Sequence, residues 1–409
     1  CYISIMDHRE RYQNLVKFLL PHQEIWRNEI MLQYPHPLAA YNSLWVEELL
    51  NYITPNKMLP FMLGKGWEQL SPDLAKFHAR VLELSTFPAP TNLASLVPRP
   101  KSWVRIIPKK RHELERLAPL IASLAPNKRI VDIGGGQGHL AQTLAHHYEM
   151  DVLSLDMDPQ LQKTGLQRQN VKWENSPHRV RFQQHKIERV DKKFADLLNS
   201  QTLTSGLHTC GTLAVAHMVA ASAARATLVN LPCCYHKMEI LDYNLSSVAH
   251  TAPLNWNQFA LTLASGPHLK VTLEDIRFRE QVKRYRYALH FLLHDELSIK
   301  TQVTLGNASQ ELYAGPYPVY VREQLMRLNQ KLTWTDQQLN DQYQKSQGMI
   351  DQMIAATIIR DVFGRVIEAT ILTDRALWLQ EQNMQCEILE VFDPSISPRS
   401  LALVASPSL

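Results

Sequence analysis

A glycine-rich turn between a short apolar strand and a helix is the segment of this sequence best suited to hold a ligand. Residues 130–133 form the expected strand, and Asp132 lies near its end. Gly134, Gly136 and Gly138 follow, and glycines allow a backbone to pass close to a bound molecule. The helix that begins after them would turn its positive amino end toward that molecule. The pattern predicts a binding site for a nucleoside cofactor.

The spacing of the glycines indicates which nucleoside is bound. A dinucleotide fingerprint requires glycine or alanine at the position of His139, so NAD and FAD fit poorly. Asp156 ends the next expected strand, where an acid can hold two ribose hydroxyls. The arrangement resembles motifs I and II of class I S-adenosylmethionine-dependent methyltransferases. This resemblance implies S-adenosylmethionine as the cofactor, bound by Asp132, Gly134, Gly136, Gly138, Asp156, Met157, Gln184 and His185.

Histidines and cysteines follow two later strands and should meet at one edge of the sheet. In an open parallel sheet, ligands bind beyond the carboxyl ends of the strands. His208 or His236 could there accept the proton of a weak nucleophile, because histidine titrates near neutral pH. We take as candidate catalytic residues His208, Cys233, Cys234, Tyr235 and His236.

The cysteines at this edge leave three interpretations open. Cys210, Cys233 and Cys234 could bind zinc together with the histidines, but no C-x-x-C pair is present, and we predict no metal. The Thr209-Cys210 and Pro232-Cys233 pairs also resemble those of pyrimidine C5-methyltransferases, although on exchanged strands. The third interpretation is that they are small thiols packed below the cofactor.

Strand and helix patterns alternate from residue 108 onward, which predicts a parallel sheet. Five strands are expected at 130–133, 152–156, 180–183, 203–208 and 226–231, and two more at 386–392 and 401–405. The predicted fold class is therefore α/β. We expect the seven-stranded, Rossmann-like sheet of class I methyltransferases, with a helical amino-terminal unit and a largely helical insertion between strands five and six.

These patterns divide the chain into five segments. Residues 1–87 form the helical amino-terminal unit, and the proline-rich residues 88–107 form a linker. The first part of the catalytic domain covers 108–236, the helical insertion 237–362, and the final helix with strands six and seven 363–409. Met6 resembles a start residue, so residues 1–5 would be upstream sequence.

Composition limits the class of protein. The net charge of +4 and a sequence pI near 8.7 are compatible with a polyanionic partner without requiring one. No apolar run reaches membrane-spanning length, and the nearest, 210–224, contains His217. Five cysteines, odd in number and unevenly spaced, do not describe a disulfide framework. We expect a globular protein of the reducing cytoplasm, without a membrane segment.

Several short blocks together resemble the methyltransferase-like 25 family, which includes proteins described as ribosomal RNA adenine dimethylase domain-containing. The sequence departs from the family pattern at two positions, since the family usually has an acid where Thr212 stands and Asn where Ser400 stands. These differences concern the substrate more than the cofactor. The chain is more distantly similar to tRNA ribose 2′-O-methyltransferases that carry a CHHC zinc finger, which is absent here. The matching blocks lie at 108–113, 131–140, 206–211, 233–236 and 392–399.

The resemblance and the basic segments make RNA of the translation apparatus, rRNA or tRNA, the leading substrate. Cations interleaved with aromatic rings between Arg277 and Tyr287 could bind phosphates and stack on bases. A protein substrate and a non-catalytic RNA- or protein-binding scaffold with a residual cofactor site are the alternatives. We take as candidate substrate-binding residues Lys109, Lys110, Arg284, Arg286 and Arg399.

Overall fold

The structure is a computed structural model that describes residues 7–91, 93, 106–125, 127–174, 176–266, 272–301 and 308–408. It divides into two compact units. The sheet unit comprises Cys1–Leu20, Glu83–Lys270 and Arg365–Leu409, and the helical unit comprises Pro21–Leu82 and Val271–Gly364. Most of the expected linker and the expected start at Met6 lie outside the described residues.

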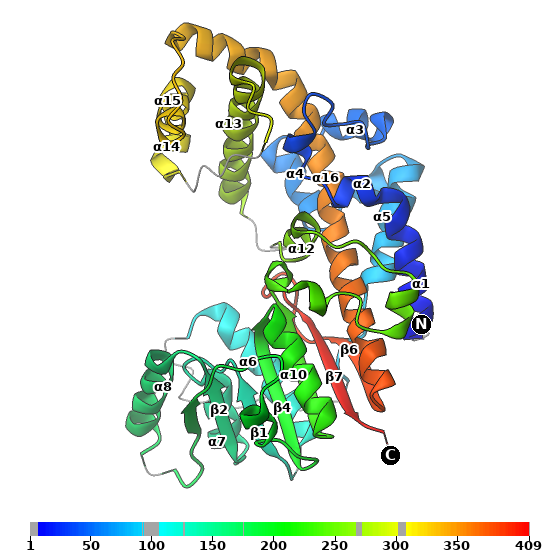
Figure 1. The fold of residues 1–409 in the computed structure, drawn as a ribbon, viewed down its shortest axis with the longest axis vertical. Coiled ribbons are helices and arrows are strands. Elements are labelled where there is room, and N and C mark those ends of the chain that lie inside the picture. The colour runs from blue at the N-terminus through cyan, green and yellow to red at the C-terminus, as the bar shows by residue number, and fades with distance from the viewer. Residues whose placement is uncertain are drawn as a thin grey trace. The chain divides into compact units, whose positions relative to one another are not determined.

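A seven-stranded sheet forms the centre of the sheet unit (Figure 1). Its strand order is β3-β2-β1-β4-β5-β7-β6, and only β7 runs antiparallel to its neighbours. The strands are β1 (Arg129–Ile133), β2 (Val152–Asp156), β3 (Arg181–Gln184), β4 (Thr202–Cys210), β5 (Thr227–Cys233), β6 (Met384–Glu390) and β7 (Leu401–Pro407). This order confirms the Rossmann-like class I methyltransferase fold expected from the sequence.

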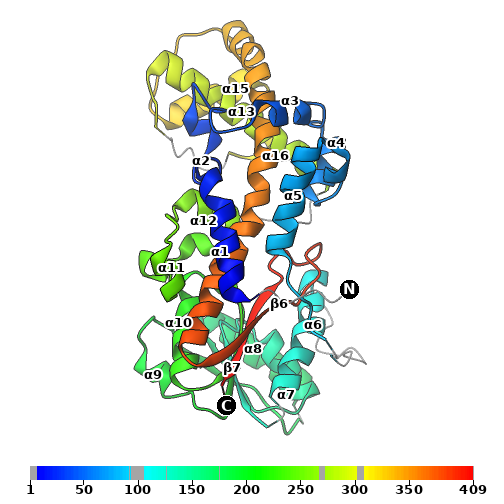
Figure 2. The same cartoon turned by 90° about the vertical axis from the view of Figure 1, so that its right-hand side faces the viewer.

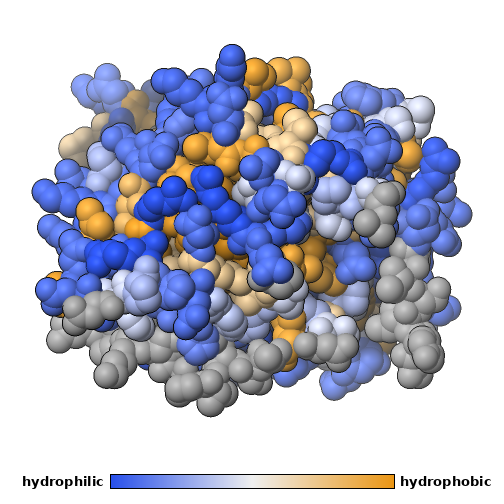
Figure 3. All heavy atoms as spheres, turned by 90° about the horizontal axis from the view of Figure 1, so that it is seen from below, coloured by the Kyte–Doolittle hydropathy of each residue, from blue (hydrophilic) through white to orange (hydrophobic). Residues whose placement is uncertain are grey.

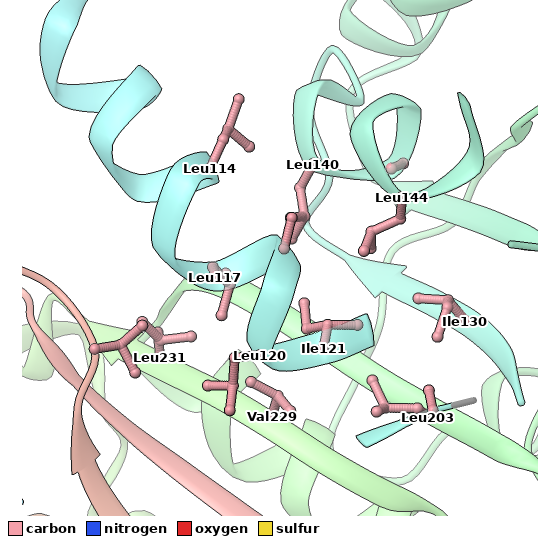
Figure 4. Close-up of a cluster of buried hydrophobic side chains, with 14 of the residues drawn as sticks. Leu114, Leu117, Leu120, Ile121, Ile130, Leu140, Leu144, Leu203, Val229 and Leu231 are labelled. Atoms are coloured by element: carbon pink, nitrogen blue, oxygen red, sulfur yellow. The ribbon is translucent and has the colours of Figure 1, made fainter. Parts of the chain in front are cut away.

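Helices cover both faces of this sheet, because alternate strand residues point to opposite sides. Ile130, Val152 and Leu203 pack in one buried cluster with α6 and α7, and Figure 4 shows the leucines of α6 over the strands. Val131 and Leu153 belong to a second cluster with α9 and α10 on the other face. The helices are α6 (Pro108–Leu124), α7 (His139–His147), α8 (Pro159–Lys172), α9 (Lys192–Ala195) and α10 (Thr212–Ala223).

Segments far from this core in sequence complete the sheet unit. The first helix packs beside the last strands (Figure 2), where His8 Nε2 donates a hydrogen bond to the Cys386 carbonyl at 3.0 Å. Asp374 accepts hydrogen bonds from the backbone N–H groups of Leu245 and Ser246, which fixes the chain after β5. These outer helices are α1 (His8–Leu19), α11 (Ser247–Thr251) and α12 (Gln258–Ala264).

The helical unit joins two distant parts of the chain. Its core includes an aromatic cluster in which Tyr285 contacts Tyr317, Tyr320 and Tyr343. The helices confined to it are α2 (Gln23–Trp26), α3 (Ser43–Leu50), α4 (Pro55–Met62), α13 (Leu273–Leu297), α14 (Gln310–Ala314) and α15 (Tyr317–Arg327). Two helices have residues in both units, α5 (Pro72–Ser85) and α16 (Asp336–Glu381).

This division differs from the one drawn on the sequence. Residues 1–87 do not form a separate unit, because α1 belongs to the sheet unit while 21–82 group with 271–364. The beginning of the insertion, up to residue 270, also belongs to the sheet unit. Local patterns predicted the helices but not these groupings, which depend on contacts between distant segments. The final helix of the sequence prediction is the end of α16, a helix of 46 residues.

No helix among the described residues is both long and apolar enough to cross a membrane. The face of the molecule seen in Figure 3 is covered largely by hydrophilic side chains, with hydrophobic ones between them.

Candidate functional site

Asp156 is fixed at the carboxyl end of β2, beside the glycine-rich loop. Its Oδ2 accepts a hydrogen bond from the backbone N–H of Gly136 at 2.8 Å, and its Oδ1 accepts one from the N–H of Asp158 at 2.9 Å. Asp158 in turn caps α8, with Pro159 as the first helical residue. Each carboxylate oxygen keeps a further lone pair. The carboxylate is therefore held in one orientation and remains able to accept two hydroxyl groups.

Asp132 is a buried acid without a hydrogen bond to its Oδ2 among the described residues. Burial, and secondarily the charge of Asp156, raise its pKa to about 7, although Lys110 opposes the shift. A Cβ atom at Gly135 would lie only 2.6 Å from Asp132 Oδ2. A Cβ at Gly138, where φ is +69°, would lie 2.5 Å from the Phe182 ring. Only glycine therefore fits at these two turns of the loop.

The other predicted cofactor residues lie beside Asp156 but differ in accessibility. Met157 exposes 65% of its surface, which leaves an apolar side chain free to cover a flat ring. Gln184 is exposed and donates to the Met157 carbonyl at 3.3 Å. The ring of His185 is held by Asp191, whose Oδ2 lies 2.7 Å from Nε2. Met157 and Gln184 thus present groups to a ligand more readily than the His185 ring does.

A histidine–carboxylate pair lies at the carboxyl end of β4, the strand that pairs with β1 on the side away from β2. His208 Nε2 is 2.8 Å from Glu113 Oε1, and the side chain of His208 is 23% exposed. His208 has φ of +65°, and the β4–β5 register shifts between Leu207 and Thr209. A non-glycine residue in this conformation is strained, and such strain concentrates at functional sites. The bulge turns His208 out of the strand pattern and toward Glu113.

Glu113 connects three separate parts of the sheet unit. It is fully buried in α6 and also accepts a hydrogen bond from Ser397 Oγ at 2.8 Å. Lys110 Nζ forms an ion pair with its Oε2 at 2.8 Å. Burial alone would raise the pKa of Glu113, but the hydrogen bond and charge of His208, with the charge of Lys110, hold that pKa well below its ordinary value. Glu113 is therefore a carboxylate, and Nε2–H of His208 donates to it.

Glu113 was not among the predicted site residues, although it lies within the block at 108–113 that resembles the methyltransferase-like 25 family. Its partners His208 and Ser397 are 95 and 284 residues away in sequence. The sequence contained one indication of its role, a glutamate on the otherwise apolar face of α6. Leu114 and Leu117 beside Glu113 are buried in the core.

Three cysteine thiols meet at the ends of β4 and β5. Cys210 and Cys233 are paired in the parallel register, and their Sγ atoms are 3.2 Å apart. Cys234 Sγ lies 3.6 Å from that of Cys233, and all three sulfurs fall within 4.8 Å of one another. Hydrogen bonding by the Cys233 thiol lowers the pKa of Cys210, and the same interaction raises that of Cys233.

Of the two remaining candidate catalytic residues, Tyr235 is buried. It is 1% exposed, and its hydroxyl donates to Glu368 Oε1 at 3.1 Å, so its catalytic role stays a prediction that this burial does not favour. Burial raises its pKa well above the ordinary value. His236 is partly exposed, and its Nδ1 is buried without a hydrogen-bond partner in the described part of the chain.

Arg399, a predicted substrate-binding residue, is engaged in contacts within the sheet unit, and its role in substrate binding stays a prediction. It is buried, and its guanidinium donates to the carbonyls of Ala264, at 2.8 Å, and Gly266. Glu368 Oε1 lies 3.5 Å from it. The sequence placed Arg399 at the correct edge of the sheet. The chain after β5 returns to this edge and supplies the two carbonyls, and α16 supplies Glu368.

The basic and aromatic stretch of α13 also differs from its prediction. Arg284 pairs with Glu280 and Asp351 at 2.9 and 2.7 Å, and Tyr285 and Tyr287 are buried. These side chains stabilise the helical unit and are not available to phosphates or bases. Arg286 is partly buried in the same helix, and its role in substrate binding stays a prediction.

Lys109 and Lys110 lie in the first turn of α6. The side chain of Lys109 is 42% exposed and 3.7 Å from Glu113, whereas Lys110 is the closer partner of that carboxylate. Lys110 therefore neutralises a buried charge, and Lys109 remains accessible beside the His208–Glu113 pair.

Residues 109–240 match a family described as a methyltransferase domain. This part of the chain is a methyltransferase domain. The match begins at the first turn of α6, includes β1 to β5, and ends just after the Cys233–His236 segment, so it contains the glycine-rich loop, Asp156, the His208–Glu113 pair and the three thiols. Such domains use a methyl donor.

The loop after β1 fits the donor that this fold implies, S-adenosylmethionine. Asp132 is a buried acid with an unsatisfied oxygen, which suits a neighbouring cationic group because the charged form would then be stabilised. Asp156 retains lone pairs for ribose hydroxyls, and Met157 offers an apolar surface beside it. Asp132, Asp156 and Met157 therefore suit a cationic group, two ribose hydroxyls and a flat ring of that molecule.

Proposed function

We propose that this protein transfers a methyl group from S-adenosylmethionine to RNA of the translation apparatus, at a hydroxyl acceptor. The hydrogen-bonded pair of His208 and Glu113 carries the proposal. A hydroxyl is a weak nucleophile, and its proton must leave as the new bond forms. A histidine oriented by a buried carboxylate is a general base suited to that task.

Each group of residues in the site has a separate role in the proposed reaction. Bound S-adenosylmethionine would supply an electrophilic methyl group on a sulfonium centre. Asp156 and the glycine-rich loop would hold that molecule in a fixed position beside the acceptor. Nε2–H of His208 donates to Glu113, so Nε2 cannot accept a proton. Nδ1 of His208 is therefore the nitrogen that accepts the proton of the acceptor hydroxyl. The carboxylate of Glu113 then stabilises the imidazolium.

Two features favour an RNA hydroxyl over an amine. The Asn/Asp-Pro-Pro-Tyr block of amino-methylating enzymes is missing at the carboxyl end of β4, where His208, Thr209, Cys210 and Gly211 stand instead. Lys109, on the exposed first turn of α6 beside the histidine–carboxylate pair, is placed to contact a phosphate. The similarity to ribosomal RNA and tRNA methyltransferase families in the matching blocks supports the same substrate class.

The compartment follows from the same proposal. Cys210, Cys233 and Cys234 are free thiols within hydrogen-bonding distance of each other, an arrangement suited to a reducing environment. We therefore place the reaction in the cytoplasm, where the translation apparatus is found.

A protein side chain is the second candidate acceptor, since the same base would serve a hydroxyl or amide of a protein. A scaffold that retains the cofactor site without catalysis is the candidate from a different class. The histidine–carboxylate pair favours an enzyme, because a binding scaffold has no need of a base.

A methyl-transfer assay distinguishes these possibilities. Full-length protein is incubated with tritiated S-adenosylmethionine and, separately, total RNA and total protein from cells in which its gene is disrupted, so that acceptor sites are unmodified. We expect label in ribosomal or transfer RNA, with none when His208→Ala replaces the parent protein. Label in the protein fraction alone would show that the acceptor is a protein and not RNA. No label in either fraction would favour the non-catalytic scaffold.

A further inference from the structure

We propose that Cys210, Cys233 and Cys234 form a binding site for a thiophilic divalent metal ion of the zinc class, with one coordination position left to a ligand from outside the cluster. This site goes beyond the proposed methyl transfer and does not depend on its acceptor.

The positions of the sulfurs carry the proposal. Zinc–sulfur bonds of about 2.3 Å in a tetrahedral arrangement place sulfurs about 3.8 Å apart. The three thiols already lie within 4.8 Å of one another, with separations of 3.2 and 3.6 Å for the two contacting pairs. Small shifts of the side chains would bring them around one ion. The 3.2 Å separation is well beyond a disulfide bond of about 2.05 Å, and the cysteines are free.

The backbone around the thiols is bent in a way that brings them together. Cys234 has φ of +50°, a left-handed conformation that is unfavourable for a cysteine. Gly211 has φ of +54°, and a Cβ there would lie 2.6 Å from the carbonyl carbon of Lys237. These two turns direct the ends of β4 and β5 so that three sulfurs converge. Ordinary strand ends would leave Cys233 and Cys234 pointing to opposite sides.

The surroundings suit a metal–thiolate cluster. A divalent ion displaces the protons of the thiols into solvent, and three thiolates with one such ion carry a single net negative charge. Lys237 interacts electrostatically with Cys210 and Cys234, and its positive charge offsets that excess. Thiolate ligands select zinc and similar soft or borderline ions over magnesium or calcium.

The number of ligands indicates an open site. In the part of the chain that the structure describes, no further His, Cys, Asp or Glu side chain joins the three sulfurs. Structural zinc sites are closed by four protein ligands, whereas sites with three protein ligands keep a position for water or substrate. Cys210 and Cys234 are partly exposed, so a ligand from solvent can reach the ion.

Metal binding by the full-length chain tests the proposal. Protein is purified under reducing conditions, freed of metal with a chelator and titrated with zinc in competition with a chromophoric chelator, and with cobalt(II) in parallel. We expect one equivalent of metal and near-ultraviolet sulfur-to-cobalt charge-transfer absorption. Cys210→Ser and Cys234→Ser should each abolish stoichiometric binding, whereas the control Cys386→Ala, which changes the buried thiol of β6, should retain it.

Binding of S-adenosylhomocysteine and far-ultraviolet circular dichroism show whether each variant is folded, since no cysteine belongs to the predicted cofactor site. Failure of the folded parent protein to bind metal would overturn the proposal. So would equal binding by the parent and the two serine variants.

Discussion

Replacement of His208 by alanine is expected to lower turnover by about 100- to 10,000-fold, the usual contribution of a general base. Affinity for S-adenosylhomocysteine should remain within about twofold, because a base acts in the transition state and not in cofactor binding. The measurement is steady-state methyl transfer to the RNA fraction that accepts label, with calorimetry of the same protein samples.

His236→Ala is the matched control for this substitution. His236 follows β5 at the same edge of the sheet, but among the described residues no carboxylate contacts its ring as Glu113 contacts that of His208. We therefore expect a much smaller loss of turnover in His236→Ala. Equal turnover in His208→Ala and the parent protein would show that His208 is structural and would remove the base from the mechanism.

Replacement of Glu113 by alanine is expected to lower the free energy of unfolding by about 3 kcal/mol. Removal of one partner of a buried ion pair typically costs about 3–5 kcal/mol, and the partial exposure of Lys110 and His208 places this case at the lower end. Ser397 Oγ also loses its acceptor. Denaturant unfolding at pH 7 measures the effect, and Glu188→Gln, in an exposed pair with Lys186, should change stability by less than about 0.5 kcal/mol.

The pH dependence of the Glu113 effect has a defined sign. Its folded-state pKa lies well below the ordinary value of 4.5, so the charged carboxylate contributes stability above that pH. The contribution is lost as the pH falls through the folded-state pKa. The difference in stability between the parent and Glu113→Gln should therefore be full at neutral pH and decrease below about pH 4.5. A difference that grows with acidification would contradict the ion-pair network.

The parts of the fold that were predictable are those encoded by adjacent residues. Asp132, the glycines and Asp156 belong to consecutive strands and turns, so their types and spacing were enough to place them at one edge of the sheet. Strands β6 and β7 are distant in sequence, yet they were identifiable because the fold required two more strands after β5. The side chains at strand ends, such as Cys210 and Cys233, were likewise placed together correctly.

The parts that were not predictable depend on contacts across long stretches of chain. Tyr285 resembled a stacking surface between cations, but α15 and α16 supply tyrosines that bury it. Arg284 forms an ion pair with Asp351, 67 residues later, and Arg399 donates hydrogen bonds to carbonyls more than 130 residues earlier. The sequence pattern shows that a charged side chain is present, but not which distant group forms an ion pair or hydrogen bond with it. The role of Glu113 was missed for the same reason.

The most direct test of the account is calorimetric binding of S-adenosylhomocysteine to the parent protein and to Asp156→Ala. Asp156 is fixed by two backbone N–H groups and has lone pairs left for ribose hydroxyls. Loss of hydrogen bonds to a charged group should weaken binding by at least about 1.5 kcal/mol, or roughly tenfold. Asp151→Ala, at the opposite end of β2, should bind as the parent does. No binding by the parent protein, or undiminished binding by Asp156→Ala, would contradict the assignment of this edge of the sheet as the cofactor site.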